Sequence, residues 1–354
     1  MNMLSRENIL RAIRFESPEF IPMRIWVNPA CWHHYDQEAL KDLLESHPLL
    51  FPDYRRPQGK VIPDYAPNAI AGKPYTDAWG CIWNTTDSGI TGSVHTHPLD
   101  NWEGFDNYRM PDPETTDGTY PIDWDHIKRS TEKAKEKGDP TMLGLPHGHC
   151  FLRLQDIRGY QNLMFDMVDE EPRFLKLLSM IQEFDCRFVA KCAELQPDII
   201  SLPEDLGMQS GPMISPVHFR KFIKPIYRKC MDIARRSGCI VHMHSDGDIR
   251  TLVDDLVDAG VDVINLQDLV NGIDWIAGRF AGKKCIELDI DRQSITRFGT
   301  PSQIDALIRE EVERLSTPQG GLMMIFGMYP GIPLENAKAL MDAMERYCQH
   351  VRIQ

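Results

Sequence analysis

Two histidines and two aspartates lie close together in residues 241–248, which read Val-His-Met-His-Ser-Asp-Gly-Asp. Successive side chains of a β-strand point to opposite faces, so His242 and His244 would share one face. Two imidazoles with a nearby carboxylate form a ligand set that zinc and other divalent ions accept. A His-x-His pair at a strand end is equally compatible with a hydrogen-bonded structural pair. The adjacent carboxylates and the tight turn at Gly247 favour a metal site made of His242, His244 and Asp246.

Other ionisable side chains follow other predicted strands, and in parallel α/β folds functional groups gather beyond the C-terminal ends of the strands. Glu204 and Asp205 are adjacent, so in extended structure one can face the site while the other caps a helix or forms an ion pair. A carboxylate at such a position can act as a general acid or base. His147 lies in a His-Gly-His run that could also be a polar turn. The predicted catalytic residues are Glu204, His244, Asp289 and Tyr329, and the predicted substrate-binding residues are Trp26, Trp79, His147, Gln267 and Asp205.

The elements that must position these residues are short apolar runs that alternate with amphipathic helical patterns from residue 122 onward. Strands are predicted at residues 141–145, 199–202, 240–244, 263–266, 284–288 and 322–326, and helices at residues 5–15, 123–138, 171–195, 216–237, 249–259, 275–281, 301–315 and 334–350. Strict alternation implies parallel strands with helical crossovers, in a (β/α)8 TIM-type barrel or an open doubly wound sheet. No GxGxxG follows the first strand and no phosphate-binding GxxxxGK[ST] occurs, which favours the barrel. We predict one barrel domain over residues 1–354, with residues 121–354 as its main βα repeats.

Residues 26–113 are rich in tryptophan, glycine and proline and show no regular pattern over most of their length. Residues 79–83 alternate in a way that indicates a strand or a hairpin. An aromatic-rich irregular segment of this length is typical of a lid or a site wall. We therefore predict that residues 1–120 form a helix followed by a lid-like segment.

The composition is that of an ordinary globular protein, with 42% hydrophobic and 26% charged residues among 354. A formal net charge of -13 excludes an electrostatic grip on nucleic acid or on an anionic membrane. No run approaches the roughly 20 apolar residues of a membrane span, and the charged N-terminus lacks a signal pattern, which predicts a cytoplasmic protein. The nine scattered cysteines form no C-x-x-C pair and indicate reduced thiols.

Several short motifs follow one another along nearly the whole chain. They are residues 5–10 (SRENIL), 20–22 (FIP), 77–81 (DAWGC), 203–207 (PEDLG), 214–216 (ISP), 219–222 (FRKF), 244–249 (HSDGDI), 260–267 (GVDVINLQ) and 333–336 (PLEN). In this order and spacing they resemble the uroporphyrinogen decarboxylase superfamily, and most closely its cobalamin-dependent methyltransferase branch. The decarboxylase itself carries an Arg-Gln-Ala-Gly-Arg segment that holds substrate carboxylates, whereas residues 23–29 here offer only Arg24. The resemblance therefore implies a methyltransferase rather than a decarboxylase, and, because relatives are often dimers, a homodimer.

The methyltransferase branch uses zinc to bind a thiol and lower its pKa, so that the thiolate accepts a methyl group from methylcobalamin. Its ligands come from a His-x-Cys-Gly motif and from a later cysteine in the last strand–loop. Here His244-Ser245-Asp246-Gly247 has aspartate in place of that cysteine, and residues 327–331 contain no cysteine. Oxygen ligands in place of thiolates weaken the affinity for zinc. The resemblance thus implies a harder site, made of His244 and Asp246 with His242 or Glu204, or a site without metal.

The leading hypothesis is a methyltransferase-like enzyme that moves a methyl group between a small methylated compound and a corrinoid protein, a pterin or a thiol. Its cofactors would be zinc or another divalent metal and a corrinoid supplied by a partner protein. The alternatives are a metal-dependent lyase, decarboxylase or hydrolase acting on a small carboxylated substrate, and a non-catalytic binding protein on the same barrel.

Overall fold

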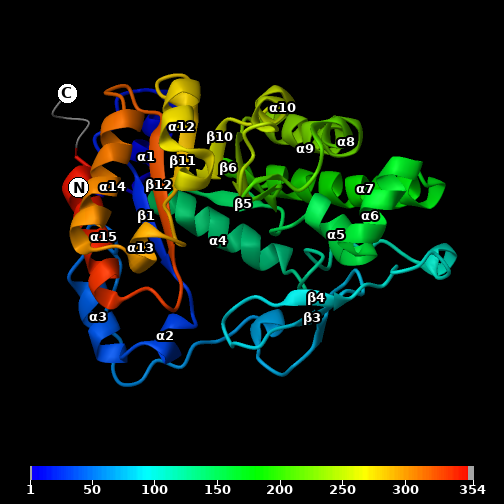
Figure 1. Ribbon diagram of the computed structural model, residues 1–354, viewed down its shortest axis with the longest axis horizontal. Coiled ribbons are helices and arrows are strands. Elements are labelled where there is room, and N and C mark those ends of the chain that lie inside the picture. Colours follow the sequence, from blue (N-terminus) through cyan, green and yellow to red (C-terminus); the bar gives the residue numbers. More distant parts are fainter. Residues whose placement is uncertain (1, 350–354) are drawn as a thin grey trace. The chain divides into compact units, whose positions relative to one another are not determined.

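The computed structural model describes residues 2–349, and contacts between residues divide the chain into two compact units (Figure 1). Unit 1 comprises the chain up to Ala69, the short segment Asp87–Ile90 and the chain from Asn265 onward. Unit 2 comprises Ile70–Thr86 and Thr91–Ile264. The division does not decide whether residues 1–354 form a single domain, which stays a prediction.

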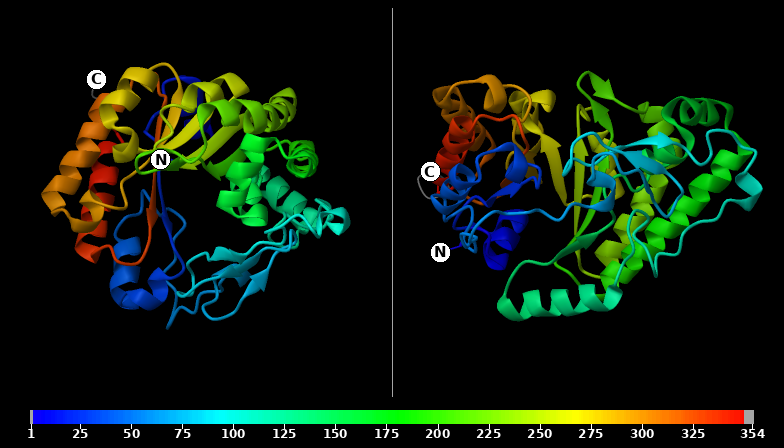
Figure 2. Two further views of the ribbon diagram at one scale, coloured as in Figure 1. Left: turned by 45° about the vertical axis from the view of Figure 1, so that its right-hand side comes forward. Right: turned by 90° about the horizontal axis from the view of Figure 1, so that it is seen from below.

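In unit 1, parallel strands lie in the order β1-β12-β11-β10, where only the last three residues of β10 belong to the unit. Helix α1 packs against β11 and β12, and α14 packs along α15, as the orange and red helices of Figure 2 show. The strands are β1 (Met23–Val27), β10 (Val263–Gln267), β11 (Cys285–Asp289) and β12 (Leu322–Met328). The helices are α1 (Arg6–Arg14), α2 (Cys31–His34), α3 (Gln37–Glu45), a 3-10 turn (Pro67–Ala69), α11 (Asp268–Asn271), α12 (Ile273–Phe280), α13 (Ile295–Phe298), α14 (Pro301–Leu315) and α15 (Leu334–Tyr347).

In unit 2, the parallel strands lie in the order β9-β6-β5, and a separate antiparallel sheet has the order β2-β3-β4. The long helix α7 packs along α9, and α5 packs against β6 (Figure 1). The strands are β2 (Tyr75–Thr76), β3 (Ile82–Asn84), β4 (Ser93–Thr96), β5 (Met142–Gly144), β6 (Ile199–Asp205), β7 (Gly207–Met208), β8 (Gly211–Pro212) and β9 (Ile240–Asp246). The helices are a 3-10 turn (Phe105–Asn107), α4 (Trp124–Lys137), α5 (Phe151–Arg158), α6 (Tyr160–Asp169), α7 (Pro172–Glu194), α8 (Pro216–His218), a π-helical turn (Phe219–Ile223), α9 (Lys224–Arg236) and α10 (Val253–Ala259).

Parallel strands alternate with helices in both units, which confirms the predicted α/β class of the (β/α)8 TIM-barrel type. All six predicted strands are present. The residues of β10 and β11 are all buried, as expected of parallel strands covered on both faces, whereas Met142 of β5 is exposed. The predicted C-terminal limit of the last helix, residue 350, lies outside the described residues. Among the described residues, no helix is long and apolar enough to cross a membrane.

The N-terminal segment is more ordered than predicted. Residues 26–113 contain α3, whose N-cap Asp36 accepts a hydrogen bond from the backbone N–H of Ala39 at 2.8 Å. The predicted strand or hairpin around residues 79–83 is a hairpin, because β2 pairs with β3 and the chain turns between them. All nine cysteines are free, as predicted, and eight of them are buried.

Candidate active site

A cluster of two histidines and two aspartates lies at the C-terminal ends of β5, β6 and β9 in unit 2. The parallel register sets Pro203 opposite His244 and Asp205 opposite Asp246, and His147 lies three residues beyond the end of β5. Strands that end at the same level bring their last side chains to one edge of the sheet. We call His147, Asp205, His244 and Asp246 the histidine–aspartate cluster.

The imidazoles of this cluster converge on one carboxylate oxygen. His147 Nε2 lies 3.3 Å from Asp205 Oδ1, and His244 Nε2 lies 3.6 Å from the same atom. His244 Nε2 is also 3.5 Å from Asp246 Oδ1, and the backbone N–H of Asp246 donates to Asp205 Oδ1 at 3.1 Å. The His147 side chain is 52% exposed and that of His244 is 18% exposed, so His147 forms the solvent side of the cluster.

The charges of the cluster stabilise one another. Burial alone would raise the pKa of Asp205, but hydrogen bonds and charge interactions with His147 and His244 outweigh it and hold this pKa well below its usual value. Burial would lower the pKa of His147, but the hydrogen bond and the charge of Asp205 reverse the shift and raise it. Asp205 is therefore an ionised carboxylate that orients both imidazoles.

Backbone packing fixes the loop that carries Asp246. Gly247 has φ +80°, and a Cβ there would lie 2.1 Å from the carbonyl carbon of Gly207. The next residue, Asp248, donates its backbone N–H to Met208 O at 2.8 Å. Only glycine allows this close approach at a left-handed backbone, so Gly247 is required for the turn.

Glu204 points away from the cluster, as the alternation of adjacent residues predicts. Its carboxylate is completely buried and accepts hydrogen bonds from the backbone N–H groups of Cys150, Phe151 and Leu152 at 2.8–3.1 Å, and from Tyr227 Oη at 2.7 Å. These N–H groups belong to the start of α5, which has no side-chain cap of its own. The carboxylate of Glu204 thus caps α5, and its predicted catalytic role stays a prediction.

The side chains of His242, Trp79 and His149 lie in the interior of unit 2. Of these, His242 was predicted as a metal ligand and Trp79 as a substrate-binding residue. His242 Nδ1 bonds to Ser201 Oγ at 3.0 Å, and its side chain is buried one strand layer below His244. Trp79 is 2% exposed and packs edge-on against Phe184, with ring centroids 5.2 Å apart. His149 turns inward, and its Nδ1 lies 2.8 Å from Asp185 Oδ2. His147 and His149 therefore have different environments, although only Gly148 separates them.

The remaining predicted residues lie in unit 1, where Trp26 and Tyr329 form an edge-on ring pair with centroids 5.5 Å apart. Asp289 is buried at the end of β11 and accepts a hydrogen bond from Arg292 Nη2 at 3.0 Å. The Arg292 guanidinium also lies over the Tyr329 ring, 5.7 Å from its centroid. Gln267 is buried at the end of β10.

Sequence reasoning missed two ionisable residues, one in each unit. Arg292 was not singled out, although it follows the Asp-Ile-Asp run that ends β11. Asp156 of α5 is the other: burial raises its pKa to about 7, and the charge of Arg153 opposes that shift. Its position inside a helix that sequence patterns did not predict left no signal by which to find it.

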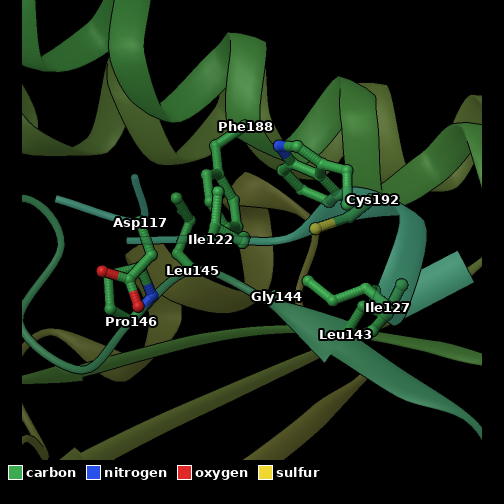
Figure 3. A pocket seen from close by; sticks show the side chains of 10 residues that line it. Asp117, Ile122, Ile127, Leu143, Gly144, Leu145, Pro146, Phe188 and Cys192 are labelled. Atoms are coloured by element: carbon green, nitrogen blue, oxygen red, sulfur yellow. The ribbon is translucent and has the colours of Figure 1, made fainter. Parts of the chain in front are cut away.

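Unit 2 also contains a cavity of about 260 Å³ beside β5, lined in part by residues of α4 and α7 (Figure 3). Its walls are mainly apolar, and none of the four cluster residues lines it. The lining residues are Asp117, Ile122, Trp124, Ile127, Leu143, Gly144, Leu145, Pro146, Phe188 and Cys192. Asp117 is occupied by its own loop, since Oδ1 accepts the backbone N–H groups of Thr119 and Tyr120 at 2.7 and 2.6 Å. The cavity therefore offers apolar contacts rather than acid–base or metal chemistry.

Comparison with known proteins gives a family and several similar folds. The family model described as uroporphyrinogen decarboxylase (URO-D) matches residues 76–347. Among solved structures, a methyltransferase from Methanosarcina mazei shares 17% identity and a TM-score of 0.66, with 97% of this chain and 98% of that chain covered. A 2,3-dimethylmalate lyase shares 10% identity and a TM-score of 0.38, with 99% and 89% covered. A search of curated protein sequences gives no significant match.

Proposed function

The chain belongs to the uroporphyrinogen decarboxylase family, and from this premise we propose that it is a methyltransferase-like enzyme. It would move a methyl group between a small methylated compound and a corrinoid protein or another acceptor. The observation that carries the proposal is the convergence of His147, Asp205 and His244 at the C-terminal ends of parallel strands. The likeness of fold to a methyltransferase over nearly the whole chain supports it as analogy.

The donor atoms of the cluster suit a divalent metal ion. One ligand atom from each of His147, Asp205 and His244 lies within 4.8 Å of the others. Two imidazole nitrogens and one carboxylate oxygen are the protein ligands of many catalytic zinc sites. We therefore propose these three residues as ligands, with Asp246 beside them, in place of a set that includes the buried His242. When bound, the ion would act as a Lewis acid on the group that gives or accepts the methyl.

The chain's own residues have separate tasks in this proposal. Asp205 keeps both imidazoles in one orientation, and His147 meets the substrate because it is the most exposed member of the cluster. In either direction, the bond from the methyl carbon to the donor atom breaks as the bond to the acceptor forms. When the donor is a small oxygen or nitrogen compound, its donor atom keeps the electron pair and takes a proton from water. When the donor is the methylated corrinoid, the corrinoid keeps the pair and the acceptor gives up its proton to water.

A metal-dependent lyase or decarboxylase acting on a small carboxylated substrate is the second candidate. Two guanidinium groups of unit 1 favour it, since Arg24 and Arg292 are 41% and 21% exposed and can present donors to a carboxylate. Both already pair with carboxylates, Arg24 with Glu287 at 2.9 Å and Arg292 with Asp289 at 3.0 Å. A carboxylated substrate would have to compete with these partners, which makes this candidate the weaker one.

The test is methyl transfer to a purified corrinoid protein from a panel of methylated and methoxylated small molecules, followed by the absorbance of the corrinoid. Metal content is measured on the same preparations. We expect transfer in the wild type and its loss, with the loss of one metal equivalent, in His244→Gln. The matched control is His126→Gln, because His126 is an exposed histidine of α4 whose Nε2 lies 3.5 Å from Ser130 Oγ.

Absence of transfer from every donor, or an unchanged rate in His244→Gln, would contradict the proposal. Release of carbon dioxide from a carboxylated compound without any corrinoid would favour the lyase instead.

A further inference from the structure

A second group of metal-binding side chains lies in unit 1, formed by His33, His34 and Asp87. His34 Nε2 is 2.7 Å from Asp87 Oδ2, and His33 Nε2 is 3.3 Å from Asp87 Oδ1. The two imidazole rings lie beside each other with centroids 4.5 Å apart, so both Nε2 atoms point toward the same carboxylate. Residues from different parts of the chain thus direct three metal-binding atoms to one point.

Tyr65 contacts Nδ1 of His33, so Nε2 is the ring nitrogen that can bind a metal. His33 Nδ1 lies 2.7 Å from Tyr65 Oη, and the ring of Tyr65 stands edge-on to the imidazole at 5.9 Å. Histidines that bind metals through one ring nitrogen use the other to donate a hydrogen bond to a neighbour. With an ion bound, Nδ1–H would donate to Tyr65 Oη, and the Nε2 lone pair of His33 would face the ion on the side of Asp87.

The position of Asp87 is fixed by the backbone around it. Gly89 has φ +92°, and a Cβ there would lie 2.7 Å from Ala30 N and 2.9 Å from a ring carbon of Tyr65. Gly89 also donates its backbone N–H to Ala69 O at 2.8 Å. The short segment Asp87–Ile90 is therefore packed tightly against α2 and Tyr65, which holds the carboxylate at the two histidines.

We propose that His33, His34 and Asp87 bind a divalent transition-metal ion such as zinc, at a structural site distinct from the histidine–aspartate cluster of unit 2. The three ligand atoms lie within 4.8 Å of one another. Ligands at 2.0–2.1 Å from zinc are roughly 3.4 Å apart in a tetrahedron, so small side-chain rotations close the site. The side chains are 37%, 39% and 40% exposed, so the ion enters from solvent and water completes its coordination.

The bound ion would fasten the Asp87–Ile90 segment to α2. Two neutral imidazoles and one carboxylate leave a zinc complex with a net positive charge, which a chain of formal charge -13 accommodates. The proposal concerns metal binding and stability alone, so it is independent of methyl transfer.

The experiment is a zinc titration against a chromophoric chelator, in a His244→Gln background that removes a ligand of the unit 2 cluster. We expect one zinc equivalent to remain in this background and to be lost in His34→Gln and in Asp87→Asn. Tyr65→Phe removes the hydrogen bond that orients His33, and it should lower the affinity about 10–100-fold. The unfolding midpoint should rise with zinc in the background protein and stay constant in His34→Gln, because zinc binds only the folded site.

His95→Gln is the matched control, since His95 is an exposed histidine of β4 whose Nε2 lies 3.2 Å from Ser93 Oγ. It should bind zinc as the background does. An unfolding midpoint without zinc that matches the background shows that each variant folds. The proposal is overturned if the background binds no zinc, if His34→Gln and Asp87→Asn retain the equivalent, or if His95→Gln loses as much affinity as they do.

Discussion

The ion pair between Asp77 and Arg153 is buried, and its loss should cost this protein much of its stability. Arg153 Nη1 lies 2.6 Å from Asp77 Oδ2, and the two side chains are 2% and 0% exposed. Asp77 also accepts hydrogen bonds from the backbone N–H groups of Trp79 and Cys81 at 3.0 and 2.9 Å, and from Trp83 Nε1 at 2.9 Å. One carboxylate therefore joins the β2–β3 hairpin to α5.

Removing one partner leaves a buried charge without compensation, which costs about 3–5 kcal/mol. In Asp77→Asn an amide N–H₂ group replaces one of the two acceptor oxygens. In one orientation this N–H₂ group faces the donors of Arg153 and of the Trp83 indole. In the other orientation it faces the two backbone N–H groups. In Arg153→Met the carboxylate keeps three neutral donors but loses its counter-charge. Because a domain is stable by only about 5–15 kcal/mol, either change should remove a large share of the total.

The assay is urea unfolding of the wild type, of both single variants and of the double variant, followed by tryptophan fluorescence and circular dichroism. The double variant should lose less than the sum of the single losses, since the second substitution removes a charge that is already unpaired. Arg187→Gln is the control, because its pair with Asp112 is exposed and should contribute less than about 1 kcal/mol. A loss in Asp77→Asn no larger than in this control would refute the reasoning.

Three further outcomes follow from buried groups. Glu204→Gln should lower the free energy of unfolding by about 1–3 kcal/mol, because its carboxylate caps α5, and methyl-transfer turnover per folded molecule should stay unchanged; a folded but inactive variant would return Glu204 to the chemistry. Gly247→Ala should cost at least about 1–2 kcal/mol in thermal unfolding from its left-handed backbone alone, with the clash against Gly207 in addition. Burial and the neighbouring charge of Asp268 raise the pKa of Glu311 far above its ordinary value, so wild-type stability should fall as the pH rises above that ordinary value. In Glu311→Gln the fall from pH 5 to pH 8 should be smaller in urea unfolding, and an equal fall would contradict this assignment.

The positions of strands and of strand ends could be predicted because parallel strands are marked by short apolar runs. The same reasoning separated Glu204 from Asp205, since neighbouring residues in a strand point to opposite sides. Which of the two faces the site could not be predicted, because that depends on the start of a helix 52–54 residues away in sequence. The backbone N–H groups at the start of α5 supply the answer by binding Glu204.

Helix α5 was not predicted, because its start too is determined by a contact between residues far apart in the sequence. Sequence patterns locate a helix start by a local capping side chain, and Cys150 at the N-cap position of α5 makes no such bond. The cap comes instead from Glu204, through the tertiary fold. By contrast, Asp36 and Thr300 cap α3 and α14 locally. The capping signal for α3 was present in the sequence but was obscured by the irregular composition around it.

The composition of the proposed metal site shows why strand periodicity alone gave an incomplete ligand set. His242 and His244 share a strand face, but two residues along a strand separate them by one layer, and His242 meets Ser201 there. A ligand at the level of His244 has to come from a neighbouring strand or its loop, and His147 after β5 occupies that level. The family resemblance marks where two thiolates are missing, and the geometry supports a histidine and a carboxylate from adjacent strands as their replacement. Because nitrogen and oxygen ligands are harder than thiolates and donate less charge to the ion, such a site should activate an oxygen or nitrogen group better than a thiol.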